Sequence, residues 1–274
     1  MKTSSTRLLE AVKKLTHATL AARRKRIIGT QEAELLSTLA KMFKRQRKAF
    51  LTALDKKKDK WQVKEAAEED DLDWKELWAE AAGEAYEDAK PLIAAIKKAL
   101  AAAGKAQIAT LGTDISFDLA NPRAVEYMKK HGAELVTKIN ETSRDELGTL
   151  LSNSIDTGTS YDDLARSIGD LFDDFSRNRA LTIARTELGN AYEYGNSLAV
   201  NQMQDAGLDM EKSWLTDGNA DDECADNEDQ GWIAYDDTFA SGDDEPLAHP
   251  NCKCCAQYRT KQDSKDSSET DETD

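Results

Sequence analysis

The sequence predicts a mostly α-helical protein that ends in a small α+β, loop-rich unit bearing cysteine and histidine. Three observations support this fold class. Apolar residues recur at helical spacing over roughly the first two hundred residues. Helix-capping residues, glycine and proline stand near the ends of these segments. Short runs typical of strands, with Asp, Gly and Asn around them, follow Gly207.

The N-terminal region is expected to form two long helices. Residues 6–28 carry one apolar stripe, and Gly29 should end that helix. Residues 31–66 carry a second stripe, which includes Leu35, Leu39 and Phe43. Neither segment shows the alternation of a strand.

Residues 70–103 predict a third helix, which Pro91 should kink or divide. Gly104 should end it, and residues 106–121 should form an irregular connector. Capping signals divide the chain that follows. Helix starts are predicted at Asn121-Pro122, at Thr142 or Ser143, at Ser160 with Asp163, and at Ser176; ends are predicted near Gly132, Thr157-Gly158 and Gly207.

After Gly207, residues 212–215 and 232–235 are predicted strands. The chain is therefore divided into four parts. These are a basic helical arm at 1–66, a helical bundle at 67–207, a small α+β Cys/His unit at 208–258 and a disordered acidic tail at 259–274.

Charge is distributed unevenly along the chain. The net charge is −15, yet residues 1–64 hold 18 basic and 5 acidic residues, whereas residues 204–274 hold 5 and 21. This asymmetry indicates a basic arm with an anionic partner, which can be DNA, RNA or an acidic protein surface. A solvated helical face is the alternative. The residues assigned to partner binding are Arg23, Arg24, Lys25 and Arg26 for anionic contacts, and Leu35, Leu39 and Phe43 for docking.

Targeting signals are not evident in the sequence. No apolar run is long enough to span a bilayer. Lys13, Lys14 and the basic cluster at 23–26 interrupt the N-terminal apolar stripe, so a secretory signal is not expected. The start is expected to be cytosolic, where disulfides are disfavoured and cysteines are free, catalytic or metal-bound.

All four cysteines lie in the last fifth of the chain, and His249 lies among them. Structural zinc favours four Cys and His ligands. We expect Cys224, His249, Cys252 and Cys254 to form that set, because Cys252 and Cys254 are two residues apart and face one side of an extended strand. Cys255 would then be the spare thiol. The alternative is a set of buried thiols that serve packing alone.

Arg185-Thr186-Glu187 lies within a predicted helix. Arg185 and Glu187 are two residues apart, so they face different directions and each can anchor to another element. We expect Arg185 to be a buried tie to a carboxylate of the C-terminal unit. A solvated pair of charges is the alternative.

Several segments, taken in order, resemble the bacteriophage Mu protein F-like minor head proteins over about residues 115–257. They are Ser116 to Val125, Ile183 to Glu187, Trp214 with Asp217, Cys224 to Asn227 with Gly231, and Phe239, Ser241-Gly242, Pro246 and His249 to Cys254. Lys253 stands where the family pattern leads us to expect arginine, which keeps the charge. Asp217 is expected to be a structural polar residue, as are Arg185 and Glu187.

The resemblance implies a non-catalytic component of the capsid interior, made in the host bacterial cytoplasm. It implies portal protein and major capsid or scaffolding protein as partners, with packaged DNA as a further one and a role in DNA packaging or ejection. Two other classes stay open: a zinc-dependent nucleic-acid-processing enzyme and a toxin-delivery module. The short sequence after residue 258 weighs against the toxin-delivery module. Removal of residues 1–64 is expected to leave a folded protein that is no longer incorporated into heads.

Overall fold

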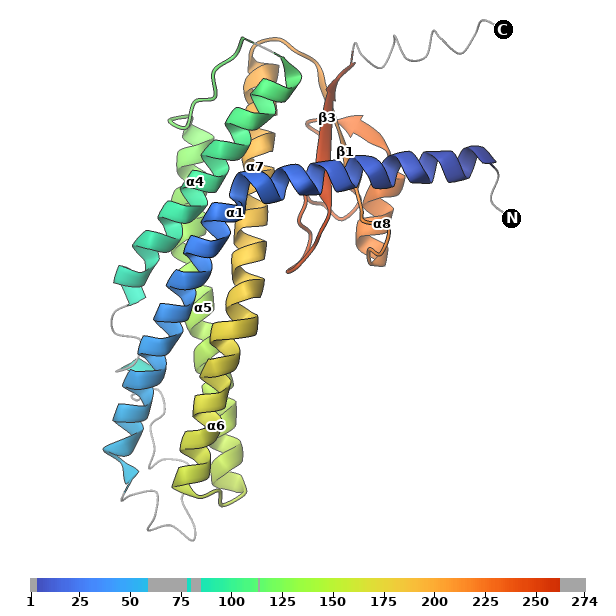
Figure 1. Cartoon of the computed structure of the whole chain (residues 1–274). Helices are drawn as coiled ribbons and strands as arrows, with labels where there is room; N and C mark the ends of the chain where they lie inside the picture. The colour runs from blue at the N-terminus through green and yellow to red at the C-terminus, as the bar shows by residue number, and fades with distance from the viewer. Residues whose placement is uncertain (1–3, 59–77, 80–84, 113, 262–274) are drawn as a thin grey trace, which may run out of the picture. The chain divides into compact units, whose positions relative to one another are not determined.

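The computed structural model describes residues 4–58, 78–79, 85–112 and 114–261 (Figure 1). These form a mostly helical protein with a small antiparallel sheet, which confirms the predicted fold class. The helices are α1 (Ser4–Asp55), α4 (Ala85–Leu111), α5 (Pro122–Asp156), α6 (Tyr161–Asp174), a π-helical turn (Phe175–Arg179), α7 (Ala180–Asp205) and α8 (Asp222–Asp229). The strands are β1 (Met210–Leu215), β2 (Trp232–Ala234) and β3 (Cys255–Thr260).

These elements group into two compact units, and both are discontinuous in sequence. Unit 1 comprises residues 1–33, 95–125 and 182–274, and unit 2 comprises residues 34–94 and 126–181. The predicted four-part division stays a prediction. The sequence predicts a disordered acidic tail. Most of that tail, residues 262–274, lies outside the described part of the chain.

Unit 1 contains the sheet, whose strand order is β2-β1-β3. The central strand β1 pairs with both neighbours in antiparallel register, with Ser213 opposite Trp232 and Leu215 opposite Cys255. One side chain from the connector also packs in this unit, because the ring of Phe117 lies directly over Gly104 of α4. Apolar clusters lie among the described residues of this unit. One contains Ile108, Ala199, Val200, Met203 and Met210, and another contains Trp214, Cys224, Phe239, Cys252 and Cys254.

Unit 2 has an aromatic core. Phe175 contacts Phe43 and Phe172 with ring centroids 5.5 and 5.3 Å apart, and the Arg179 guanidinium lies 4.7 Å from the Phe175 ring centroid. Leu35, Leu39 and Phe43 are at most 1% exposed. Their assignment as a docking surface is therefore wrong for this structure, because the protein's own helices cover the stripe.

Several predicted helix boundaries are confirmed. Pro122 begins α5, and the Asn121 side chain accepts a hydrogen bond from the backbone N–H of Arg123 at 2.9 Å. Ser160 caps α6 by accepting from the N–H of Asp163 at 3.2 Å. Gly158 and Gly207 adopt positive φ just beyond α5 and α7. These are positions that glycine occupies without steric cost.

Other predicted boundaries are wrong. Helix α1 runs through Gly29, α4 runs through Gly104, and α5 runs through Gly132. Thr142 does not cap a helix start, because its hydroxyl donates to the Lys138 carbonyl within α5 at 2.9 Å. Ser176 lies in the π-helical turn that joins α6 to α7. The predicted helix start near residue 70 lies outside the described residues.

No helix in the described part of the chain is both long and apolar enough to cross a membrane.

Candidate metal centre

The candidate centre is built from α8 and from the segment that leads into β3. Asp221 begins α8 by accepting a hydrogen bond from the Cys224 N–H at 2.9 Å, which places the Cys224 side chain on the first turn. A tight turn brings the other two groups together, since the N–H of Cys252 donates to the His249 carbonyl at 3.1 Å. Asn251 adopts a φ of 61° within that turn.

Three ligand atoms converge at this place. The Cys224 Sγ atom lies 3.7 Å from the Cys252 Sγ atom and 3.7 Å from the His249 Nε2 atom, and all three atoms lie within 4.8 Å of one another. Ligand atoms of a tetrahedral zinc with usual bond lengths lie about 3.5–3.8 Å apart. The two separations from Cys224 therefore match those expected between ligands of one metal ion.

The environment of Cys254 fits the same centre. Cys254 is not part of the three-residue group, but it is 3% exposed and interacts with the Cys252 side chain, which raises the pKa of Cys254. The same contact lowers the pKa of Cys252. The indole Nε1 of Trp214 is buried without a nitrogen or oxygen partner and lies close enough to Cys254 to oppose that rise in pKa. An N–H group directed at a ligating sulfur is a usual second contact in metal sites.

The neighbouring thiols shift one another's pKa in opposite directions. Burial raises the pKa of Cys224, while its neighbours favour the thiolate of Cys252. A hydrogen bond to the Pro250 carbonyl raises the pKa of His249. A thiolate held between two buried thiols is a ready ligand for a soft divalent cation.

The fourth cysteine lies apart from the three-residue group. Cys255 is 1% exposed, and its thiol donates to the Lys253 carbonyl at 3.9 Å. Burial raises its pKa to about 12, and Glu193 and Arg24 are its charged neighbours. Its assignment as the spare thiol stays a prediction.

Asp221 contributes to the site and was not among the predicted residues. Its Oδ2 atom lies 2.9 Å from His249 Nε2, and its other oxygen caps α8. The signal was present in the sequence, because an Asp three residues before Cys224 is an N-cap pattern. The contact to His249 depends on tertiary structure, which the pattern does not contain.

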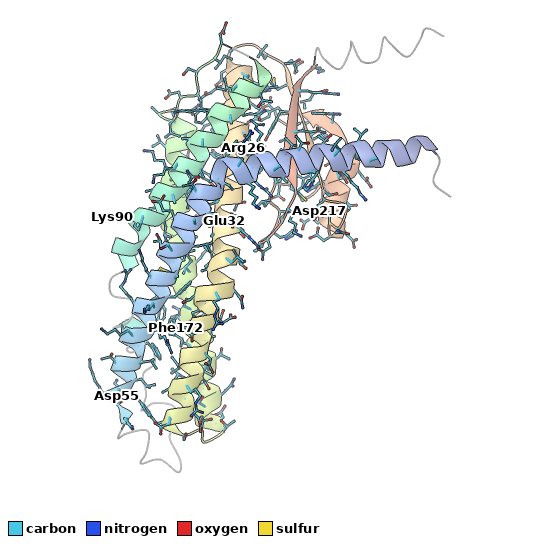
Figure 2. All side chains as sticks on the ribbon, viewed as in Figure 1. Arg26, Glu32, Asp55, Lys90, Phe172 and Asp217 are labelled. Atoms are coloured by element: carbon cyan, nitrogen blue, oxygen red, sulfur yellow. The ribbon has the colours of Figure 1, made fainter. Side chains whose placement is uncertain are left out.

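Arg185 is not the buried tie that the sequence predicts. Its side chain is 58% exposed, and its Nε atom lies 3.6 Å from Glu32 on α1, which Figure 2 labels. Two threonines on α7 contact the C-terminal unit instead. Asn251 donates through its N–H to the Thr186 hydroxyl at 3.2 Å and through its side chain to the Thr182 hydroxyl at 3.3 Å.

The other two residues with a predicted structural role lie on α7 and in the loop after β1. Glu187 is half-buried on α7. Asp217 follows β1 (Figure 2) and accepts from the Asn219 N–H at 3.0 Å, which closes the loop before α8. Its other oxygen lies 3.8 Å from the Lys253 ammonium group. Asp217 therefore stabilises the loop beside the centre.

The predicted anionic-contact residues separate into two kinds. Arg23 and Arg24 face the protein: Arg23 donates to the Gln107 side chain at 3.1 Å, and Arg24 donates to the Cys254 carbonyl at 3.1 Å. Lys25 and Arg26 are exposed. The first two are therefore structural contacts in this chain, and the last two remain available to a partner.

Residues 145–257 match the family model described as Phage Mu protein F like protein. The match confirms the predicted resemblance over this part of the chain. It includes the whole candidate centre, whereas the predicted Ser116 to Val125 motif lies outside it. The family is a structural phage head type. No curated protein and no solved structure matches the chain.

Proposed function

We propose that this protein is a non-catalytic minor component of a phage head, which acts inside the capsid beside the portal during head assembly. The Phage Mu protein F-like region at 145–257 is the observation that carries the proposal. That family implies capsid-related partners. Portal protein is the partner proposed for docking, and major capsid or scaffolding protein and packaged DNA are secondary partners.

The outward face of α1 is the proposed docking surface. Val12 and Leu15 are 53% and 71% exposed, and they lie three residues apart on one side of the helix. His17 and Arg24 lie on the other side and contact the protein. This surface takes the place of Leu35, Leu39 and Phe43, because exposed apolar side chains in a helical row are available to a partner.

Parallel capture experiments test the docking proposal. The purified protein is incubated with portal protein, with major capsid protein and with DNA. Portal capture should survive moderate salt and be lost in Val12→Lys/Leu15→Lys. The Lys25→Gln/Arg26→Gln variant is the matched control, which should keep portal capture and weaken any DNA binding that falls steeply with salt. Capture by portal that is unchanged in the Val12→Lys/Leu15→Lys variant would contradict the surface.

A structural zinc ion is the proposed cofactor, with Cys224, His249, Cys252 and Cys254 as ligands. The 3.7 Å separations within the Cys-His-Cys group support the proposal. Elemental analysis of the purified protein should find about one zinc per chain. Cys252→Ser should lose the metal, and the neighbouring Cys255→Ser should retain it. Metal-free wild-type protein with an intact C-terminal sheet would contradict the proposal.

The non-catalytic role has its own test. DNA and RNA incubated with the zinc-loaded protein should stay intact. Cleavage that depends on the metal and disappears in Cys252→Ser would support a nucleic-acid-processing enzyme and overturn the proposed role.

A further inference from the structure

The ligand-bearing segment before β3 is held from outside the centre by α1. The His17 side chain donates through Nε2 to the Lys253 carbonyl at 2.9 Å. The Arg24 guanidinium donates to the Cys254 carbonyl at 3.1 Å and to the Lys253 carbonyl at 3.4 Å. These two carbonyls belong to Lys253, which lies between two of the proposed ligands, and to Cys254, which is one of them. Helix α1 therefore binds the backbone that carries the thiol ligands (Figure 1).

The same contacts extend to α7. Arg24 Nη1 lies 3.5 Å from Glu193 Oε1, and the other Glu193 oxygen accepts from the Ala256 N–H at 3.3 Å. Glu193 is fully buried, and the Arg24 side chain is 16% exposed. A buried cation and a buried carboxylate need all of their partners, since an unsatisfied charge is costly in such surroundings. These contacts depend on the positions of the backbone atoms of residues 253, 254 and 256.

A bound metal would fix that conformation. Cys252 and His249 lie in the segment before β3, whereas Cys224 lies on α8. An ion that bridges them ties the segment to α8, in addition to the pairing of β3 with β1. Loss of the ion leaves the backbone of residues 252–254 with fewer constraints. The carbonyls that receive His17 and Arg24 then lose their fixed positions.

We propose that the metal centre is a latch for the N-terminal part of α1, residues 11–28. With a zinc-class divalent cation bound, His17 and Arg24 hold this segment on the C-terminal sheet. When the cation leaves, the segment detaches and its inner face, with His17, Arg24 and the buried Ile28, becomes available. The inference rests on the proposed metal site. It adds that metal occupancy regulates the helix that carries the docking surface.

The coupling must act in both directions, because linked equilibria are reciprocal. Metal loss weakens the attachment of residues 11–28, so loss of the α1 contacts must weaken metal binding. Arg24 is therefore a positioning residue for the centre, although it touches no metal. Contacts that orient metal ligands commonly change metal affinity by about 10- to 100-fold.

Hydrogen exchange of the full-length protein tests the latch. With zinc bound, amides of residues 11–28 should be protected. Chelation should increase their exchange by about tenfold or more, and one equivalent of Zn²⁺ should restore protection. Amides of residues 35–50, which belong to unit 2, serve as the internal reference and should not change.

Variants test the reverse direction. Arg24→Gln should increase exchange in residues 11–28 and weaken zinc affinity by about tenfold. Lys25→Gln is the matched control, because it removes one positive charge from the adjacent exposed position and should change neither quantity. The Arg24→Gln/Glu193→Gln variant removes both buried charges. It gives the same test if the single variant does not fold.

The outcomes separate the two levels of the proposal. Zinc binding with equal protection of residues 11–28 in the loaded and chelated protein would overturn the latch and leave the metal site standing. Unchanged zinc affinity in a folded Arg24 variant would do the same. A wild-type protein that binds no zinc would overturn the metal site and the latch together. None of these results bears on capture by portal, which is measured separately.

Discussion

Glu193 is a buried acid with two neighbours that favour its charged form. It is fully buried on α7, where Arg24 and the Ala256 N–H face its two oxygens. Burial raises its pKa to about 7, although Arg24 opposes the rise. In an unfolded chain a glutamate titrates at about 4.3. The folded protein therefore binds a proton that the unfolded chain has lost between about pH 4.3 and pH 7.

This difference predicts a pH dependence of stability. Glu193 contributes its full stabilisation below about pH 4, and the unfolding free energy falls as pH rises through about 7, by about 3 kcal/mol. Urea denaturation at pH 5 and pH 8 measures the fall, which should be smaller in Glu193→Gln. Parallel pH profiles for the two proteins would show that the carboxyl group is ionised in both states.

Arg185, unlike Glu193, is a charged residue that we expect to contribute little to the unfolding free energy. Its pair with Glu32 is at the surface, where solvent screens the attraction. Arg185→Ala should lower the unfolding free energy by less than about 1 kcal/mol. Thermal unfolding of this variant beside Thr186→Val makes the comparison, because Thr186 accepts the hydrogen bond from Asn251. A loss of several kcal/mol in Arg185→Ala alone would restore the buried tie that the sequence predicts.

Glycines within helices have different roles in α1 and α7. A Cβ atom at Gly29 would have no neighbouring atom within 4 Å. A Cβ atom at Gly195 would clash with the backbone carbonyl of Leu100 on α4. Gly195 therefore permits the close approach of two helices, whereas Gly29 contributes only flexibility to the unfolded chain.

The pair gives a matched prediction. Gly29→Ala should stabilise the protein by up to about 1 kcal/mol, because alanine favours helix. Gly195→Ala should destabilise it by about 1–3 kcal/mol, because α4 must move away. Thermal or denaturant unfolding measures the change in unfolding free energy of each variant. Equal changes would mean that helix propensity alone determines the effect of alanine at both positions.

Helix starts could be predicted where a local polar signal was sufficient, as at Asn121 and Ser160. Gly104 and Ser143 were misread because packing partners distant in sequence explain them. Phe117 covers Gly104, and the Ser143 hydroxyl accepts from Arg179 at 3.0 Å. The clustering of cysteines with His249 located the candidate centre. The contacts of Arg24 and Glu193 could not be predicted, because they join α1, α7 and β3.

Across the whole molecule, α1 contributes to both units. Residues 4–33 belong to unit 1 and residues 34–55 to unit 2. The second stretch supplies fully or almost fully buried side chains to its unit's core: Leu35, Leu39, Met42, Phe43, Phe50 and Leu54. Residues 35–54 of the predicted basic arm thus contribute buried side chains to the core of unit 2.

Deletion of residues 1–64 should therefore prevent unit 2 from folding. Each large buried side chain that is lost costs about 2–5 kcal/mol, and the sum exceeds the stability of an ordinary domain. Circular dichroism and hydrogen exchange across α5 and α6 measure the effect. The Val12→Lys/Leu15→Lys variant serves as the control and should stay folded. A folded truncation would mean that α1 is dispensable, as the sequence prediction assumed.

Because unit 1 is discontinuous in sequence, its parts are synthesised at different times. The first part of α1 leaves the ribosome long before α7 and the three strands, from which about 150 residues separate it. At usual rates of translation this is a delay of roughly 8 to 30 seconds. A lone helix is marginal in water, so the nascent segment spends that interval with its apolar stripe uncovered. We therefore expect the growing chain to depend on chaperones, and slow elongation should increase aggregation of this protein.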